Sequence, residues 1–287
     1  MTARTKGFCT VMISAIFFGL MPMFAKIVCA GGGNVICIAF YRFFISLLPL
    51  FIYLKVKKIS FSLSRKELRQ ITLITVCGYG GTAFLLYLSY DFIPSGMATT
   101  IHFVYPVFVI LGSILFLKVR PEPLKLLCVA LCMGGILLFS NGQSGDSVIG
   151  VLIAFASGIT YAFYVIYLDR SGLQKIPTLK LIFYMNSIAS VILLIGNLAT
   201  GYFTVALSPT AWISMTALAV GASFIGVCLF QKGMGVIGPQ NAAILSTFEP
   251  ITSLLMGVIL FHESFTLQTA VGCVLILISV VIVAKTE

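Results

Sequence analysis

The stretch Ile93-Pro94-Ser95-Gly96-Met97-Ala98, followed by Tyr105-Pro106, returns in altered form 144 residues later. There the chain reads Ile237-Gly238-Pro239-Gln240-Asn241-Ala242, followed by Glu249-Pro250. The same offset aligns Arg42 with Asn186, and an offset of 143 or 144 aligns Phe18 with Tyr161. The spacing of alanine and proline therefore predicts two related halves. Repeated halves in a membrane protein usually place a substrate site where they meet.

The composition excludes an ordinary soluble domain. Hydrophobic residues make up 60% of the chain and charged residues only 9%, whereas a soluble domain carries about 25% charged residues. Apolar runs of about 20 residues recur, as membrane-crossing helices require, and the ten-residue alternation of a β-barrel is not visible. The sequence predicts an all-α integral membrane protein whose solvent is partly the lipid bilayer.

The apolar runs predict ten membrane spans joined by short turns. They lie near 8–30, 35–54, 70–90, 96–117, 124–141, 148–168, 178–197, 210–231, 240–261 and 266–284. The first run is too long for a cleavable signal peptide. The longest polar stretch, Lys55 to Gln70, is expected to hold a short surface helix capped by Ser64, with Glu67 completing a capping box. Breaker clusters at Gly31–Asn34, Asn141–Ser147 and Ser208-Pro209 mark the turns.

The basic residues predict the orientation. Sixteen of the 18 Lys and Arg residues fall on one side of the ten-span arrangement. The positive-inside rule makes that side cytoplasmic, together with both termini. This asymmetry also accounts for the net charge of +10, which in a soluble protein would suggest a nucleic-acid partner. We expect no nucleic-acid partner and a multi-pass location in the cell membrane, most simply a bacterial inner membrane.

Five spans separate each position from its counterpart, and five is an odd number. The second half must then cross the membrane in the opposite sense to the first. The predicted fold is ten transmembrane helices in two inverted five-helix repeats, 1–143 and 144–287, an arrangement typical of alternating-access transporters.

With these features the chain resembles the drug/metabolite transporter superfamily, specifically its EamA-type ten-span members. The resemblance rests on Phe40-Tyr41-Arg42-Phe43, Phe248-Glu249-Pro250, Leu260-Phe261-His262-Glu263 and the prolines at matched positions of spans 4 and 9. The first half departs from the pattern, since Leu117-Lys118-Val119-Arg120 lacks the Glu. The resemblance implies a fused, duplicated small multidrug transporter fold with a central cavity lined by spans 1–4 and 6–9. It also implies transport of small solutes, commonly export of amino acids or other metabolites.

Three charged side chains fall inside predicted spans, which makes each a functional candidate because intramembrane charge is costly. Lys26 lies near the outer end of span 1, where it either contributes to the site or snorkels to the surface. Arg42 lies roughly 10 Å into span 2 and either binds an anionic group or clamps helices together. Glu249, near the middle of span 9, is a candidate proton carrier, a ligand for a substrate amine, or an ion-pair partner of Arg42 or Lys26. With all three ionised, the cavity would carry a charge near +1.

Five uncharged candidates accompany them. His102 and Tyr105 share a face of span 4, and Ser246 shares a face with Glu249. Pro106 and Pro250 free the carbonyl groups of His102 and Ser246, which become ligands unless neighbouring helices satisfy them. Tyr79 and Tyr161 occupy inner positions of polar stripes on spans 3 and 6. Each of these five could equally be a packing residue.

The preferred function is a secondary transporter for a small organic solute such as an amino acid. The alternatives are an integral-membrane enzyme or lipid-handling protein, and a non-transporting scaffold or receptor. The sequence contains no HExxH, GKS/T or GxSxG signature, so we expect no catalytic residues, metal or cofactor. Protons are a candidate coupling ion, and monomer and homodimer both stay open. The eight cysteines are expected to be small packing residues, nearly all of them inside apolar runs, and a Cys29–Cys37 disulfide also stays open.

Overall fold

The computed structural model describes residues 2–93, 95–118, 120, 122–138, 147–261 and 266–285. Within these ranges the chain is built from helices and contains no β-strand. Parts of several predicted features lie outside the described residues: Pro94, Val119, the end of span 5 with its following turn from 139 to 146, and the His262-Glu263 end of span 9.

Each of the ten predicted spans corresponds to one helical rod of the described chain. Seven rods are long and apolar enough to cross a bilayer, and shorter apolar helices form the other three. The rods in chain order are α1–α2 (Ala3–Gly19, Met21–Ala30), α3 (Val35–Val56), α4–η1–α5 (Arg65–Ile74, Thr75–Tyr79, Gly80–Ser89), α6–α7 (Ser95–His102, Tyr105–Leu117), α8 (Pro123–Leu137), α9 (Val148–Arg170), α10 (Thr178–Thr200), α11–η3–α12 (Pro209–Leu218, Ala219–Gly226, Val227–Ile237), α13–α14 (Pro239–Leu245, Phe248–Phe261) and α15 (Leu267–Lys285). A short 3₁₀ helix, η2 (Leu173–Lys175), joins α9 to α10.

The helix that Ser64 caps is not separate from span 3. The predicted capping box is confirmed, because Ser64 Oγ accepts from the Glu67 N–H at 3.2 Å and Glu67 Oε2 accepts from the Ser64 N–H at 2.7 Å. The helix then continues through η1 into α5 without a break. No proline follows Ser64 until Pro94, so nothing ends the helix where the polar stretch ends.

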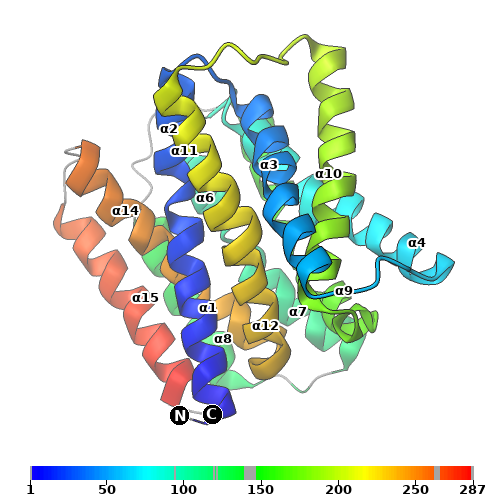
Figure 1. Ribbon diagram of the computed structural model, residues 1–287. Coiled ribbons are helices and arrows are strands. Elements are labelled where there is room, and N and C mark those ends of the chain that lie inside the picture. Colours follow the sequence, from blue (N-terminus) through cyan, green and yellow to red (C-terminus); the bar gives the residue numbers. More distant parts are fainter. Residues whose placement is uncertain are drawn as a thin grey trace.

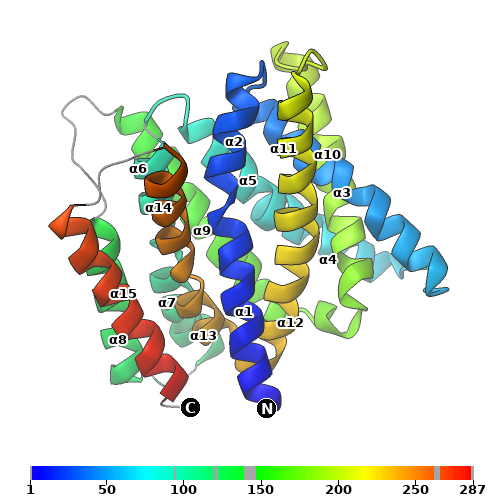
Figure 2. The same cartoon turned by 60° about the vertical axis from the view of Figure 1, so that its left-hand side comes forward.

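The helix pairs repeat between the two halves, as an inverted duplication requires. Helix α3 packs against its counterpart α10, and α8 packs against its counterpart α15. Helix α1 of the first half corresponds to α9 of the second, and α5 corresponds to α12. Helix α1 packs against α12, and α9 packs against α5, so this pair of contacts also repeats. Figure 2 shows α8 and α15 together at one edge of the bundle.

Three rods are broken near a proline. Helix α1 ends at Gly19 before Pro22, α6 ends at His102 before Pro106, and α13 ends at Leu245 before Pro250. Proline cannot donate to the carbonyl four residues earlier, which interrupts the helical ladder. The breaks in α6–α7 and α13–α14 occupy matched positions of the two halves. The break in α1–α2 has no counterpart, since α9 is continuous.

The π-helical segments η1 and η3 also occupy matched positions, since they begin at Thr75 and Ala219, 144 residues apart. Each widens the helix by one residue per turn, a distortion that often accompanies functional sites. The duplication has therefore preserved a local irregularity as well as the helix order.

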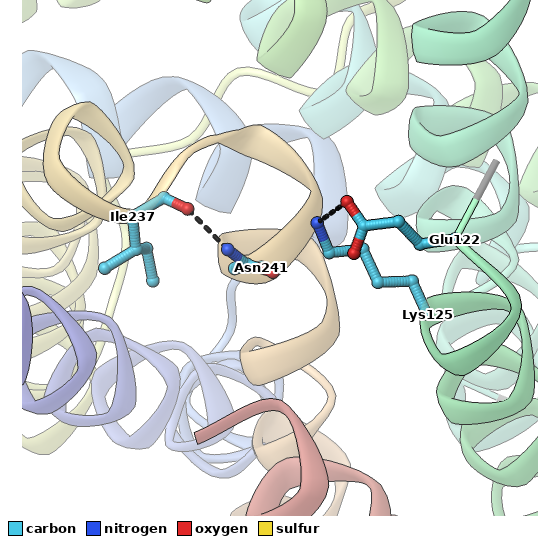
Figure 3. Close-up of polar contacts among 4 residues, drawn as sticks. All are labelled: Glu122, Lys125, Ile237 and Asn241. Atoms are coloured by element: carbon cyan, nitrogen blue, oxygen red, sulfur yellow. Dashed lines mark hydrogen bonds and ion pairs between the residues drawn. The ribbon is translucent and has the colours of Figure 1, made fainter. Parts of the chain in front are cut away.

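Helix α1 begins and α15 ends at the same end of the bundle (Figures 1 and 2), which we call the terminal end. There Gly238, at φ 81°, turns the chain from α12 into α13. Asn241 Nδ2 donates to the Ile237 carbonyl at 2.6 Å across this turn (Figure 3). Figure 3 also shows Glu122 accepting from Lys125 Nζ at 2.9 Å near the start of α8. Such a partly exposed pair contributes at most about 1 kcal/mol.

At the opposite end, which we call the distal end, the connection from α10 to α11 crosses the top of the bundle (Figure 1). Its Thr204 carbonyl accepts from Tyr41 Oη at 3.0 Å and from Cys37 Sγ at 3.4 Å, and its Ser208 N–H donates to the Gly31 carbonyl at 2.9 Å. Cys29 and Cys37 are both free cysteines. These contacts tie the distal ends of α2, α3 and α11 together.

Close packing of α1 on α12 depends on Gly233, which generates a stability prediction. A Cβ atom added there would lie 2.5 Å from Val11 Cγ2 and 2.9 Å from the Gly7 carbonyl oxygen. We expect Gly233→Ala to destabilise the protein by about 1–3 kcal/mol, the usual cost of overpacking. The measurement is thermal unfolding of the purified protein in detergent.

Gly196→Ala in α10 is the matched control, because no atom lies within 4 Å of the added Cβ there. It should leave the melting temperature unchanged or raise it, since alanine favours a helix by about 1 kcal/mol over glycine. Equal melting temperatures for the two variants would contradict the role of Gly233.

Candidate functional site

A cavity lies among the broken and distorted helices. Its lining comes from α1–α2, α3, η1–α5, α6–α7, α9, α12 and α14, and no described residue of α8, α10 or α15 takes part. Its volume of ≈ 80 Å³ holds only a few water molecules. Ligand pockets are usually several times larger, about 300–1,000 Å³, so the central cavity in this conformation is too small for a typical small-molecule ligand.

The central cavity extends toward the distal end. Ala25 lies midway along α2, Tyr90 follows α5, and Thr99 lies midway along α6. Toward the terminal end the cavity stops at an aromatic group formed by Tyr161, Tyr164 and Phe230. The ring centroids of Tyr161 and Tyr164 lie 5.5 Å apart, and those of Tyr161 and Phe230 lie 6.2 Å apart.

Arg42 lines the central cavity and is held by residues of other helices. Its Nε donates to Ser223 Oγ at 2.9 Å, and its Nη1 donates to Tyr87 Oη at 3.3 Å. The guanidinium carbon also lies 5.0 Å from the Phe43 ring centroid, within the range of a cation–π contact. With only 6% of its surface exposed, Arg42 is too deep to reach water by snorkelling.

Asn186, the counterpart of Arg42 in the second half, stabilises the same junction. Its Nδ2 donates to Ser46 Oγ at 2.7 Å and to the Ser223 carbonyl at 3.0 Å. Ser223 therefore bonds to both counterparts, through its hydroxyl to Arg42 and through its backbone to Asn186. The network joins α3, η3 and α10 and fixes the position of the guanidinium.

Glu249 lines the same cavity from α14, but it does not pair directly with Arg42. No salt bridge within 4.0 Å joins the two residues, and no described residue donates a hydrogen bond to the Glu249 carboxylate. The predicted alternative of an Arg42–Glu249 structural ion pair is therefore not what this structure contains. One guanidinium and one carboxylate face a shared space without neutralising each other through contact.

Lys26 is exposed in α2 and is not among the residues that line the central cavity. The cavity charge near +1 expected from the sequence included Lys26, which does not line the central cavity. Among the described residues, only Arg42 and Glu249 bring formal charges to the lining, and these two charges balance.

His102, Tyr105 and Tyr161 come together in the cavity wall. The His102 ring centroid lies 5.5 Å from each tyrosine ring, and the two tyrosine rings lie 4.6 Å apart. His102 Nδ1 lies 2.9 Å from Ser157 Oγ, which itself donates to the Ala154 carbonyl at 2.6 Å. Because the hydroxyl proton is used there, His102 Nδ1 must carry a proton and donate to Ser157.

Tyr79 lines the cavity from η1 with its hydroxyl buried. That hydroxyl has no hydrogen-bond partner among the described residues. A buried polar group without a partner costs about 1–3 kcal/mol. The Tyr79 hydroxyl is therefore an available donor or acceptor for a bound solute.

Ser246 does not line the central cavity, and its hydroxyl donates to the Ala242 carbonyl at 2.8 Å. Pro250 frees the Ser246 carbonyl, and this carbonyl accepts a hydrogen bond from the Glu249 N–H at 3.0 Å. The carbonyl of His102 lies where α9 passes closely, since a Cβ on Gly158 would come within 2.9 Å of its oxygen. The broken helices thus supply side chains to the cavity, whereas the Ser246 carbonyl is satisfied locally.

Sequence reasoning missed Tyr87 and Ser223, which hold Arg42. A signal for each was present in the chain. Tyr87 extends the polar stripe that contains Tyr79 and Thr82, and Ser223 lies 144 residues after Tyr79. Neither signal indicated that these residues contact Arg42, because that contact joins α3, α5 and η3 across both halves.

The fold and the cavity define a class: a multi-pass membrane protein made of two inverted helical repeats around a central cavity. The model of the EamA-like transporter family matches residues 5–141 and 148–285. The chain therefore belongs to the EamA-like transporter family, and it is a membrane transporter.

Three relatives and one solved structure are similar to this chain. An uncharacterized transporter of Archaeoglobus fulgidus is 26% identical over 280 residues, covering 96% of this chain and 95% of that protein. An uncharacterized transporter of Synechocystis is 29% identical over 68% of this chain and 60% of that protein. An uncharacterized inner membrane transporter of Salmonella typhimurium is 27% identical over 77% of this chain and 74% of that protein. A crystal structure with 16% identity superposes with a TM-score of 0.84 over 99% of each chain, which shows a shared fold.

The network around Arg42 generates a second prediction. Asn186→Leu removes the donor to Ser46 and to the Ser223 carbonyl, and it leaves both acceptors buried. We expect a loss of about 1–3 kcal/mol in stability, the usual cost of an unsatisfied buried group, measured by thermal unfolding in detergent.

Ser187→Ala, one position along α10, is the control, because the Ser187 hydroxyl bonds only within its own helix, to the Phe183 carbonyl. It should melt close to the unmodified protein. A melting temperature for Asn186→Leu equal to that of this control would show that the network does not stabilise the junction.

Proposed function

We propose that this transporter moves a small zwitterionic organic solute, such as an amino acid with an apolar side chain, across the cell membrane by alternating access. The main support is the pair of opposite charges in the central cavity. Arg42 and Glu249 face the same space from different helices and are not in contact with each other. A solute that carries both a carboxylate and an amine would satisfy both groups at once.

Arg42 is suited to the carboxylate. Two of its three nitrogens already bond to Ser223 and Tyr87, which holds the planar guanidinium in one orientation. The remaining N–H groups stay available for a charge-assisted hydrogen bond. The Tyr79 hydroxyl, which lacks a partner among the described residues, is a second donor for the same solute.

The rest of the lining suits an apolar body. Aromatic side chains dominate it, including Phe18, Phe43, Tyr90, Tyr105 and Phe230. Pockets for small organic ligands combine such an apolar lining with a few fixed polar groups. A multiply charged anion is disfavoured, because Glu249 would face it in a poorly hydrated space.

Alternating access is supported by the small cavity and the inverted repeat. A space of ≈ 80 Å³ must open to load a solute, and repeats of this kind usually rock against each other around a site at their interface. Export is the direction common among proteins that this chain resembles. Glu249 is the proposed proton carrier, because a buried carboxylate without an ion-pair partner gains most from binding a proton.

Flux measurements test the proposal. Purified protein in proteoliposomes should transport zwitterionic amino acids in preference to organic acids and amines of similar size. Arg42→Gln and Glu249→Gln should each reduce flux roughly 10- to 100-fold, the equivalent of one lost hydrogen bond to a charged group. The absence of flux for every solute in the panel, with folded protein, would contradict the proposal.

Glu122→Gln and Arg170→Gln are matched controls for the two charge changes. Both residues lie outside the central cavity, in partly exposed ion pairs with Lys125 and Asp169 respectively. Flux should remain unchanged in both. If Arg42→Gln and Glu249→Gln behave like these controls, the two residues do not bind the solute.

We also propose that both termini are cytoplasmic, because sixteen of 18 Lys and Arg residues fall on their side in the ten-span arrangement. Epitope tags at residues 1 and 287 should be cleaved by added protease in inverted membrane vesicles and protected in intact cells. Protection in inverted vesicles would reverse the proposed orientation.

A further inference from the structure

A second cavity lies at the terminal end, between α9, α10 and α12. It has a volume of ≈ 280 Å³, and its polar lining residues are Gln174, Thr178, Gln231 and Lys232. No described residue lines both this cavity and the central one. The two cavities therefore have separate linings.

A hydrogen bond connects a residue of one cavity to a residue of the other. Tyr164 lines the central cavity, Gln231 lines the terminal-end cavity, and Gln231 Nε2 donates to Tyr164 Oη at 3.1 Å. Both side chains are buried, with 1% and 6% of their surfaces exposed. Gln231 Nε2 also lies 3.8 Å from Met185 Sδ, and the neighbouring residue Phe230 lines the central cavity.

The inverted repeat explains why a second cavity exists at this place. An offset of 144 places Gln231 over Tyr87, and an offset of 143 places Tyr164 over Met21. Tyr87 and Met21 line the part of the central cavity that extends toward the distal end. Similarly, Leu168 in the terminal-end cavity corresponds to Ala25 in the central one. The terminal-end cavity is thus the counterpart, in the second half, of the distal opening in the first half.

We infer that the cavity between α9, α10 and α12 is the second branch of the solute pathway, and that contact between Tyr164 and Gln231 closes it. This inference rests on the proposed function, because it assigns the route by which the central cavity reaches the terminal end. In the present conformation the first-half counterparts, Met21 and Tyr87, line open space while Tyr164 and Gln231 touch. When Tyr164 and Gln231 separate and Met21 and Tyr87 come together, the pathway opens at the terminal end and closes at the distal end.

The chemistry of the second branch suits a polar solute. Gln174, Thr178 and Gln231 provide hydrogen-bonding groups, and Lys232 provides a positive charge at the exposed edge. A carboxylate that leaves Arg42 would meet Gln231 and then Lys232. The same lining also includes Leu168, Ile176, Leu181 and Val236, so the second branch offers apolar contacts beside its polar groups.

Thiol labelling tests the route without knowledge of the substrate. Ala83→Cys places a reporter in the central cavity, and Thr178→Cys places one in the terminal-end cavity. A membrane-impermeant methanethiosulfonate is added separately to each face of the membrane. Mass spectrometry then quantifies labelling at each position, so the native cysteines remain in place. Thr178→Cys should react from the side of the termini only.

Removal of the partition, the Tyr164–Gln231 contact, should change the access of the central reporter. In the unmodified background, Ala83→Cys should react mainly from the distal side. Combined with Tyr164→Phe, which removes only the hydroxyl, or with Gln231→Ala, it should react roughly five- to tenfold faster from the side of the termini. This factor is the population change expected from the loss of one hydrogen bond.

Matched controls on the same side are Tyr184→Phe and Gln70→Ala. Tyr184 Oη donates to the Phe61 carbonyl, and Gln70 Nε2 donates to the Ser171 carbonyl at 3.3 Å. Neither residue is among those that line the central or the terminal-end cavity. Labelling of Ala83→Cys from the side of the termini should stay at its basal rate in both controls.

Two results would overturn the inference. One is equal labelling of Ala83→Cys in the partition variants and the controls. The other is a Thr178→Cys that is not labelled from the side of the termini. Because labelling does not depend on solute flux, a labelling shift without flux would contradict the proposed function alone, and flux without a labelling shift would contradict the partition alone.

Discussion

The buried guanidinium of Arg42 needs hydrogen-bond partners that its own helix cannot supply. Burial of an unsatisfied charge within a membrane protein is costly, so the acceptors must come from neighbouring helices. Ser223 in η3 and Tyr87 in α5 provide them, and Asn186 in α10 holds Ser223 in place. A single charge in the first half therefore fixes the packing of helices from both halves, and it places the guanidinium at the edge of the central cavity.

The duplication explains the architecture, and its departures from symmetry explain the chemistry. Matched positions carry the same backbone irregularities, namely the π segments at Thr75 and Ala219 and the breaks before Pro106 and Pro250. The side chains at matched positions differ, however. Arg42 faces Asn186 in the alignment, and Tyr105 faces Glu249. The two halves therefore have similar backbones that could each adopt the conformation of the other. The cavity side chains are not duplicated, so the cavity has one positive and one negative group.

Much of the fold could be predicted from the sequence, because each span must satisfy its own backbone hydrogen bonds within lipid. That constraint makes apolar runs of about 20 residues readable as helices, and the ten predicted spans correspond to the ten rods of the described chain. The capping box at Ser64 was equally readable, since its hydrogen bonds join residues three apart. The length of its helix was not, because the polar stretch before Gln70 continues into the apolar span without a proline to end it.

The site was less predictable than the fold. Lys26 and Arg42 looked alike in sequence, as basic residues within apolar runs, yet Lys26 is exposed and Arg42 lines the central cavity. The difference depends on which face of each helix meets its neighbours, and broken helices such as α1–α2 make that face hard to derive from spacing alone. Tyr87, Ser223 and Gln231 were missed for a related reason: their partners lie 45, 181 and 67 residues away along the chain.

The sequence by itself determined the class of protein, the number of helices, the duplication and its inverted sense, because composition, span length and the parity of five spans are properties of the chain. The tertiary structure decided which polar residues share a cavity, that Arg42 and Glu249 do not touch, and that Tyr164 meets Gln231 between two cavities. Those outcomes depend on packing between helices from both halves, and packing is set by the shapes of all the side chains together.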